Sequence, residues 1–227
     1  MTKSGVIGAM QVEIETIATH LANRQEIVVA GNRFFSGYLG SIAVVLTCSG
    51  IGKVNAAMAA QILVSVFSCD AILNTGIAGN LSDELHLGDF VVANKVVYHD
   101  MDKDILAQCG PFVSYFTPDA ALCQHICQCL DGNVNYKVGT IATGDQFVED
   151  EAVKRDIIAR TGALCTEMEG GAIGHVAQKN GIPFAILRCL SDDADDAAVY
   201  DNFFEQAAMR SADITVRTIG LLGSDVI

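Results

Sequence analysis

Tryptophan is absent from the 227-residue sequence, and proline occurs only three times. Without a Pro-rich linker, we expect residues 1–227 to form a single domain. Basic residues are also scarce: 14 lysines and arginines face 27 acidic residues, which leaves a formal net charge of −13. A nucleic-acid backbone and an anionic membrane surface both attract positive charge, so neither is an expected partner. The charge favours a small-molecule or protein partner.

The sequence also lacks an uninterrupted apolar run of the roughly 18 residues that a membrane span requires. Apolar residues nevertheless make up 51% of the chain, which is enough for a large buried core. The eight cysteines are scattered, and in so apolar a chain they are interpreted as buried thiols rather than a disulfide framework. A reducing, cytoplasmic location is therefore expected.

Three cofactor motifs are incomplete. "SGIGK" resembles a phosphate-binding loop, but Thr47 and Val54 stand where that motif requires Gly and Ser or Thr. "GVIGAM" lacks the glycine spacing of a dinucleotide-binding turn. "CQHICQC" could offer ligands to zinc, but Cys123 and Cys127 fall on the apolar stripe of a helix, where packing is the favoured interpretation. We therefore expect no metal and no cofactor.

Apolar runs bounded by turn residues alternate with helical segments along the chain. Helices are expected at 11–24, 53–67 and 167–181, and strands at 70–76 and 182–193. This alternation predicts an α/β fold, a single-domain three-layer αβα sandwich with a central mixed, largely parallel sheet. Ligands of such folds bind beyond the carboxyl ends of the strands, and here those ends carry "SGIG", "NTGIAG", "TGDQF" and "LSDD".

Short motifs occur in a distinctive order between Gly5 and about Phe204. They are "IGAM" with Glu13 three residues on, "SGIGKVNAA", "NTG-x-AG", "YHD", "TGD-x-F", "EMEG" and "R-x-x-SD-x-AD". In this order they resemble the purine nucleoside phosphorylase and nucleosidase superfamily, and within it the family that cleaves 5′-methylthioadenosine and S-adenosylhomocysteine. The resemblance implies a homodimeric N-glycosyl hydrolase that takes an adenine nucleoside and releases adenine and a 5-thioribose product.

The resemblance implies three catalytic residues. Asp192 would protonate or hydrogen-bond adenine N7, Glu13 would activate the attacking water, and Arg188 would hold the water or the 2′ hydroxyl. An ordinary Asp is ionised at neutral pH, so Asp192 needs a raised pKa. Crowding by the three aspartates that follow would raise it. Alternatively, those three form a solvated loop that caps the next helix.

The resemblance also implies a set of substrate-binding residues. Glu169 would accept hydrogen bonds from the ribose 2′ and 3′ hydroxyls, whereas Glu167 is interpreted as a helix N-terminal acid favoured by the dipole. The other expected contacts are Phe147 stacked on adenine, the Val148 backbone on its Watson–Crick edge, Ser191 and the Ala194 backbone near N7, Met168 on the sugar, and Met10, Ile51 and Tyr200 around the 5′-alkylthio group.

Three features depart from the family pattern. Ile77 stands where the family has a serine that helps to place the water, and the segment after Tyr98-His99-Asp100 lacks the aromatic, glycine-rich character of the 5′ pocket. The loop between "SDDADD" and "YDNFF", which precedes Tyr200, is also about two residues shorter than the family pattern. Three alternatives follow. A phosphorylase is disfavoured because Glu13 would repel phosphate. A related adenine nucleosidase, such as an aminodeoxyfutalosine hydrolase, keeps the chemistry. A non-catalytic nucleoside-binding relative would have no need for all the charged residues.

Overall fold

The computed structural model describes residues 3–132, 134–192 and 197–223, with side chains left out at 192 and 197–202. Its strands are β1 (Lys3–Gly8), β2 (Ala22–Val29), β3 (Asn32–Leu39), β4 (Ile42–Cys48), β5 (Ala71–Asn74), β6 (Ile77–Asn80), β7 (Phe90–Tyr98), β8 (Tyr136–Thr143), β9 (Cys165–Glu167) and β10 (Phe184–Asp192). Its helices are α1 (Gln11–Ala18), α2 (Lys53–Ser65), α3 (Lys103–Ala107), α4 (Ala120–Leu130), α5 (Glu151–Thr161), α6 (Gly170–Asn180) and α7 (Ala197–Leu222).

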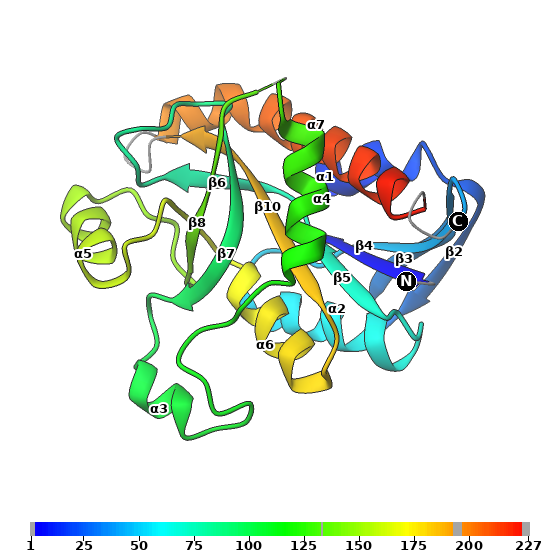
Figure 1. Cartoon of the computed structure of the whole chain (residues 1–227), viewed down its shortest axis with the longest axis horizontal. Coiled ribbons are helices and arrows are strands. Elements are labelled where there is room, and N and C mark those ends of the chain that lie inside the picture. Colours follow the sequence, from blue (N-terminus) through cyan, green and yellow to red (C-terminus); the bar gives the residue numbers. More distant parts are fainter. Residues whose placement is uncertain (1–2, 133, 193–196, 224–227) are drawn as a thin grey trace.

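The strands form one ten-stranded sheet in the order β2-β3-β4-β1-β5-β10-β6-β9-β8-β7 (Figure 1). Strand β10 also pairs with β7, so the second half of the sheet closes on itself. The pairs β1–β4, β1–β5, β5–β10, β6–β10, β7–β8 and β8–β9 are parallel. The antiparallel pairs are β2–β3, β3–β4, β6–β9 and β7–β10. The predicted mixed, largely parallel sheet is confirmed.

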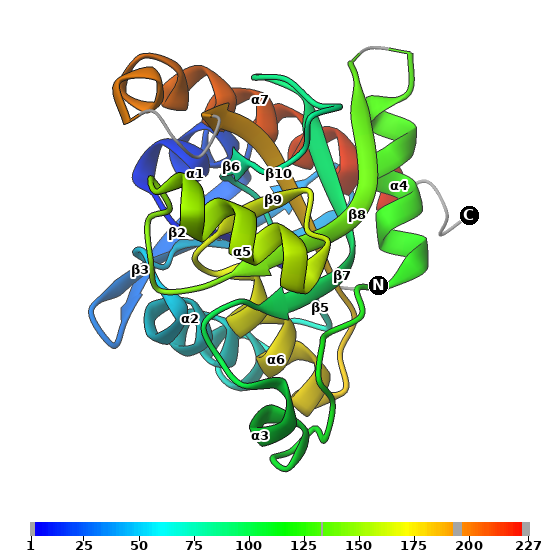
Figure 2. The same cartoon turned by 90° about the vertical axis from the view of Figure 1, so that its left-hand side faces the viewer.

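Helices cover both faces of this sheet (Figures 1 and 2). On one face, α1, α4 and α7 pack their apolar side chains, among them Ile14 and Ile126, against the strands. On the other face, α2 and α6 do the same. The buried side of α2 carries Ala56, Ala59 and Ala60, whose small side chains permit a close approach between helix and sheet. The predicted three-layer arrangement is therefore confirmed.

Some predicted element boundaries are wrong. The helix expected at 11–24 ends at Ala18, because residues from Ala22 onward pair with β3. The helix expected to begin at Glu167 begins at Gly170, because Cys165–Glu167 forms β9. The strand expected at 70–76 ends at Asn74, and a further short strand, β6, follows. Pairing with strands distant in sequence decides these cases, and local pattern does not report such pairing.

The carboxyl ends of the neighbouring parallel strands β1, β4 and β5 lie at one edge of the sheet. Strands β8 and β9 run in the opposite direction, since β9 is antiparallel to β6, yet their carboxyl ends reach the same place: Arg188 Nη2 bonds both to Asn74 at the end of β5 and to Glu167 at the end of β9. The segments that leave these ends carry most of the motifs that the sequence singles out. No helix in the described part of the chain is long and apolar enough to cross a membrane.

Candidate active site

A cavity of about 650 Å³, measured with its open mouth, lies at this edge of the sheet. It receives residues from the turn after β1, from α1, from the turn that precedes α2, from β6, from the loop after β8, and from β9 and β10. Its lining comprises Ala9, Met10, Glu13, Ile51, Thr75, Ile77, Ala78, Gly79, Gln146, Phe147, Val148, Thr166, Glu167, Met168, Glu169, Arg188 and Ser191.

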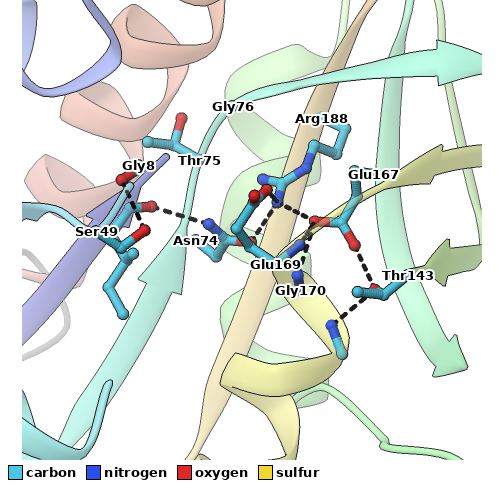
Figure 3. Close-up of polar contacts among 12 residues, drawn as sticks. Gly8, Ser49, Asn74, Thr75, Gly76, Thr143, Glu167, Glu169, Gly170 and Arg188 are labelled. Atoms are coloured by element: carbon cyan, nitrogen blue, oxygen red, sulfur yellow. Dashed lines mark hydrogen bonds and ion pairs between the residues drawn. The ribbon is translucent and has the colours of Figure 1, made fainter. Parts of the chain in front are cut away.

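An ion pair between Arg188 and Glu167 is buried beside the cavity (Figure 3). Arg188 Nη2 donates to Glu167 Oε2 at 2.5 Å and to Asn74 Oδ1 at 2.5 Å. Thr143 Oγ1 donates to the other Glu167 oxygen. Burial opposes the charge of Arg188, but the carboxylates of Glu167 and Glu169 outweigh it, and the pKa of the guanidinium is raised. A fully buried arginine is tolerable only with such partners.

Glu169 lies between this ion pair and α2. Its Oε1 accepts a hydrogen bond from the Gly52 N–H at 2.8 Å, and its Oε2 lies 3.9 Å from Arg188 Nη2. Burial, followed by repulsion from Glu167, raises the pKa of Glu169 to about 8. This carboxyl therefore exchanges its proton near neutral pH.

Glu13 also lines the cavity and is only 1% exposed. It stands in the first turn of α1, where its Oε2 accepts a hydrogen bond from the Met10 N–H at 3.0 Å. Burial raises the pKa of Glu13, while backbone N–H groups and the charge of Arg188 lower it in part. A Cβ atom at Gly76 would lie 2.8 Å from Glu13 Oε1 and 3.2 Å from Arg188 Nη1, so any larger residue here would displace the ends of these two side chains.

The structure brings most of the predicted site residues together. Beyond Glu13, Glu169 and Arg188, the predicted residues found in the cavity lining are Met10, Ile51, Ile77, Phe147, Val148, Met168 and Ser191. Phe147 and Ile51 are 46% and 55% exposed at the mouth, whereas Val148 and Ser191 are buried. Ala194 lies outside the described residues. The backbones of Asp192 and Tyr200 belong to β10 and α7, but their side chains lie outside the described part of the chain.

Sequence reasoning missed Glu167. The interpretation as a helix N-terminal acid is right in one respect, because Glu167 Oε2 accepts hydrogen bonds from the N–H groups of Glu169 and Gly170. It is wrong as a full account, because Glu167 is also the buried partner of Arg188 and lines the cavity. A buried arginine demands an anionic partner, and that requirement was the signal that could have identified Glu167.

The cysteines of α4 pack in the protein interior. Cys123 and Cys129 are buried among Leu122, Ile126 and Leu130. The packing interpretation of "CQHICQC" is therefore confirmed. Among the residues that the structure describes, no cluster of His, Cys, Asp or Glu could hold a metal ion.

The sequence of this chain is similar to a known protein family. Residues 3–220 match the family model described as "Phosphorylase superfamily". The chain is 37% identical to the 5′-methylthioadenosine/S-adenosylhomocysteine nucleosidase of Halalkalibacterium halodurans over 231 residues, which cover 98% of this chain and 100% of the relative.

Two solved structures are similar to this chain in fold and sequence. The S. pneumoniae 5′-methylthioadenosine/S-adenosylhomocysteine nucleosidase with the transition-state inhibitor MT-ImmA is 36% identical, with a TM-score of 0.91 and coverage of 97% of this chain and 100% of that one. The futalosine hydrolase of Helicobacter pylori is 30% identical, with a TM-score of 0.90 and coverage of 96% and 97%.

Proposed function

This chain belongs to the phosphorylase superfamily, and within it we propose that the protein hydrolyses the N-glycosidic bond of 5′-methylthioadenosine and S-adenosylhomocysteine, releasing adenine. The relatives that carry this name match nearly the full length of the chain. The observation that carries the proposal is the buried carboxylate of Glu13 in a cavity that also holds Glu169 and Arg188.

The charges of the cavity suit a cationic transition state. Cleavage of an N-glycosidic bond passes through a ribosyl cation-like state, which fixed negative charge stabilises. In the described lining, the carboxylates are Glu13, Glu167 and Glu169, and the single cation, Arg188, is already bonded to Glu167. The remaining negative charge therefore faces the sugar that becomes positive.

Each charged residue has a step in this mechanism. Glu13 accepts a proton from water while the water oxygen attacks C1′ of the ribose, and its raised pKa makes it a stronger base than an ordinary carboxylate. Glu169 accepts hydrogen bonds from the ribose hydroxyls. Arg188 holds the water or the 2′ hydroxyl. Adenine leaves as its N7 gains the proton supplied by Asp192, so the bond electrons end on the base.

Phosphorolysis is the competing reaction of the superfamily. It would require a phosphate dianion close to C1′, and a site for that anion needs free positive charge. Arg188 is engaged by Glu167, and Glu13 would repel the anion. Water is neutral, so the charge of Glu13 does not repel it. These charges support hydrolysis.

We also propose that the protein is a homodimer. Val54 and Met58 are exposed one helical turn apart in α2, with Val54 79% exposed, and Ile51 is exposed in the turn just before this helix. Ile105 and Phe112 of the segment after β7 are also exposed. An apolar stripe of this kind is typical of a surface that another subunit covers. Because Ile51 also lines the cavity, a partner subunit here would reach the mouth that receives the 5′ group.

The cytosol remains the proposed location. All eight cysteines are free, and this supports a reducing compartment. Residues 1–227 remain proposed as a single domain, and the continuous sheet supports that proposal.

Adenine release is the test of the proposed function. The protein is incubated with 5′-methylthioadenosine, S-adenosylhomocysteine, adenosine and aminodeoxyfutalosine, each with and without phosphate, and free adenine is quantified by chromatography. We expect phosphate-independent release, fastest from the two thio-nucleosides. Preference for aminodeoxyfutalosine would favour the alternative nucleosidase, to which the Helicobacter pylori futalosine hydrolase structure gives a specific precedent. Release only with phosphate would overturn hydrolysis.

A further inference from the structure

We propose that Lys53, Asp100 and Asp145 form a positioning ring that sets the distance between the adenine end and the ribose end of the cavity. This inference rests on the proposed function. The three residues come from the motifs "SGIGK", "YHD" and "TGD", to which the mechanism assigns no chemical step.

Hydrogen bonds join each pair of residues in the ring. The Lys53 ammonium donates to both oxygens of Asp100 at 2.7 Å. The Asp145 N–H donates to Asp100 Oδ2 at 2.8 Å. The Lys53 N–H in turn donates to Asp145 Oδ1 at 2.8 Å. Each residue therefore contacts both others, and the bonds alternate between side chain and backbone, so they fix the path of the chain as well as the side chains.

Each corner of the ring belongs to a segment that shapes the cavity. Lys53 begins α2 and directly follows Gly52, whose N–H holds Glu169, the predicted ribose ligand. Asp145 lies two residues before Phe147 and Val148, the predicted adenine contacts, and the intervening Gln146 also lines the cavity. Asp100 follows β7, which lies parallel to β8 with Tyr98 opposite Thr143. The ring therefore ties the ribose side to the adenine side and anchors both to the sheet.

Stability alone does not explain such a ring. The side chains of Lys53, Asp100 and Asp145 are 22%, 27% and 49% exposed. Ion pairs exposed to this degree contribute little to the free energy of folding. Burial raises the pKa of Asp100, but Lys53 and the Asp145 N–H lower it further, so the carboxylate is charged and keeps its bonds at neutral pH. The role that remains for the ring is to fix the relative positions of the three segments that it joins.

The ring should affect the binding of ligands that occupy the adenine end and the ribose end of the cavity at once. A nucleoside binds more tightly than its parts because one end holds the other at high effective concentration, provided that the two subsites have the right spacing. Loss of the ring loosens that spacing. Adenine alone, which uses only one end, is unaffected by it.

The test compares two ligands in Lys53→Met. Calorimetry measures the Kd of adenine and of 5′-methylthioformycin, a C-nucleoside that cannot be cleaved. We expect adenine affinity to remain within about twofold, while affinity for the C-nucleoside falls about tenfold and KM for 5′-methylthioadenosine rises in parallel. Lys53→Arg, which keeps a cation for Asp100, should recover most of the loss. Lys179→Met, at an exposed lysine of α6, is the matched control.

Two results would overturn the ring's role: an equal loss of affinity for both ligands, or no loss for either. Because the readout is binding, it is separate from the proposed reaction. A wild-type protein that binds both ligands but releases no adenine would refute the proposed function and still allow the ring to be judged.

Discussion

Arg188 Nη2 lies 2.5 Å from Glu167 Oε2, and the two side chains are only 2% and 3% exposed. The arginine comes from β10 and the carboxylate from β9, two strands that are joined through β6. The pair therefore depends on the assembled sheet. It holds the guanidinium at the cavity wall, where this single cation of the described lining faces three acidic side chains, Glu13, Glu167 and Glu169.

Replacing Glu167 with Gln should destabilise the protein, because Arg188 would stay buried without its anion. We expect the free energy of unfolding to fall by about 3 kcal/mol, as for other buried ion pairs that lose one partner. Urea denaturation measures it, with Glu205→Gln on the exposed side of α7 as the control. A loss no larger than that of the control would mean that the pair does not support the fold.

Replacing Glu13 with Gln should stop hydrolysis and leave binding largely intact. The amide cannot accept the proton of the attacking water, and a general base contributes about 10²–10⁴-fold to such a step. Steady-state kcat and the Kd of 5′-methylthioformycin are the two measurements. If binding is lost together with kcat, Glu13 has a structural role instead.

Replacing Ile77 with Ser should raise turnover. A hydroxyl at this position of the cavity lining can hydrogen-bond the attacking water, and one such bond is worth about 1 kcal/mol, or about fivefold in kcat. Ile77→Val, which changes size without adding a hydroxyl, is the control. An unchanged kcat in the serine variant would show that the water is held by other residues.

Binding should depend on pH through Glu169. Its pKa of about 8 means that the carboxyl is largely protonated below that pH. Ribose hydroxyls donate to the ionised form, so binding lowers the pKa and releases a proton. Affinity for 5′-methylthioformycin should therefore fall as the pH drops below about 8, by up to about tenfold per pH unit. Calorimetry across this range checks it; Glu169→Gln should abolish the slope, and a slope that survives in this variant belongs to another group.

Replacing Asp192 with Asn should abolish turnover, because the amide cannot deliver a proton to adenine N7. Adenine release by Asp192→Asn is compared with wild type at neutral pH. Activity near the wild-type level would remove Asp192 from the mechanism.

Much of the fold could be predicted from the sequence because alternating apolar and Ala-rich segments report burial directly. The strand at β10 and the helix at α2 are examples. The short strands β6 and β9 could not be predicted in this way. Each has only three or four residues, and each exists because Gly79 and Asn80 pair with Thr166 and Cys165, far away in the chain. The single-domain organisation stays a prediction.

The candidate site likewise contains residues that the sequence predicts and residues that it does not. Residues in distinctive motifs, such as Glu13 and Glu169, could be placed at one cavity from the order of the motifs. For Glu167 the sequence offers only part of the answer. An arginine in an apolar strand indicates that an anionic partner exists, but the contacts with Arg188 and Thr143 that make Glu167 this partner run across three strands. The chemical roles of the site residues remain predictions until the variants are measured.

The origin of the oxygen in the sugar product tests the central claim most directly. 5′-Methylthioadenosine is cleaved in water enriched in ¹⁸O, with phosphate present, and the released sugar is analysed at once by mass spectrometry. Hydrolysis with Glu13 as base predicts a free 5-methylthioribose that carries the label at C1. An unlabelled sugar 1-phosphate would contradict the account and make the protein a phosphorylase.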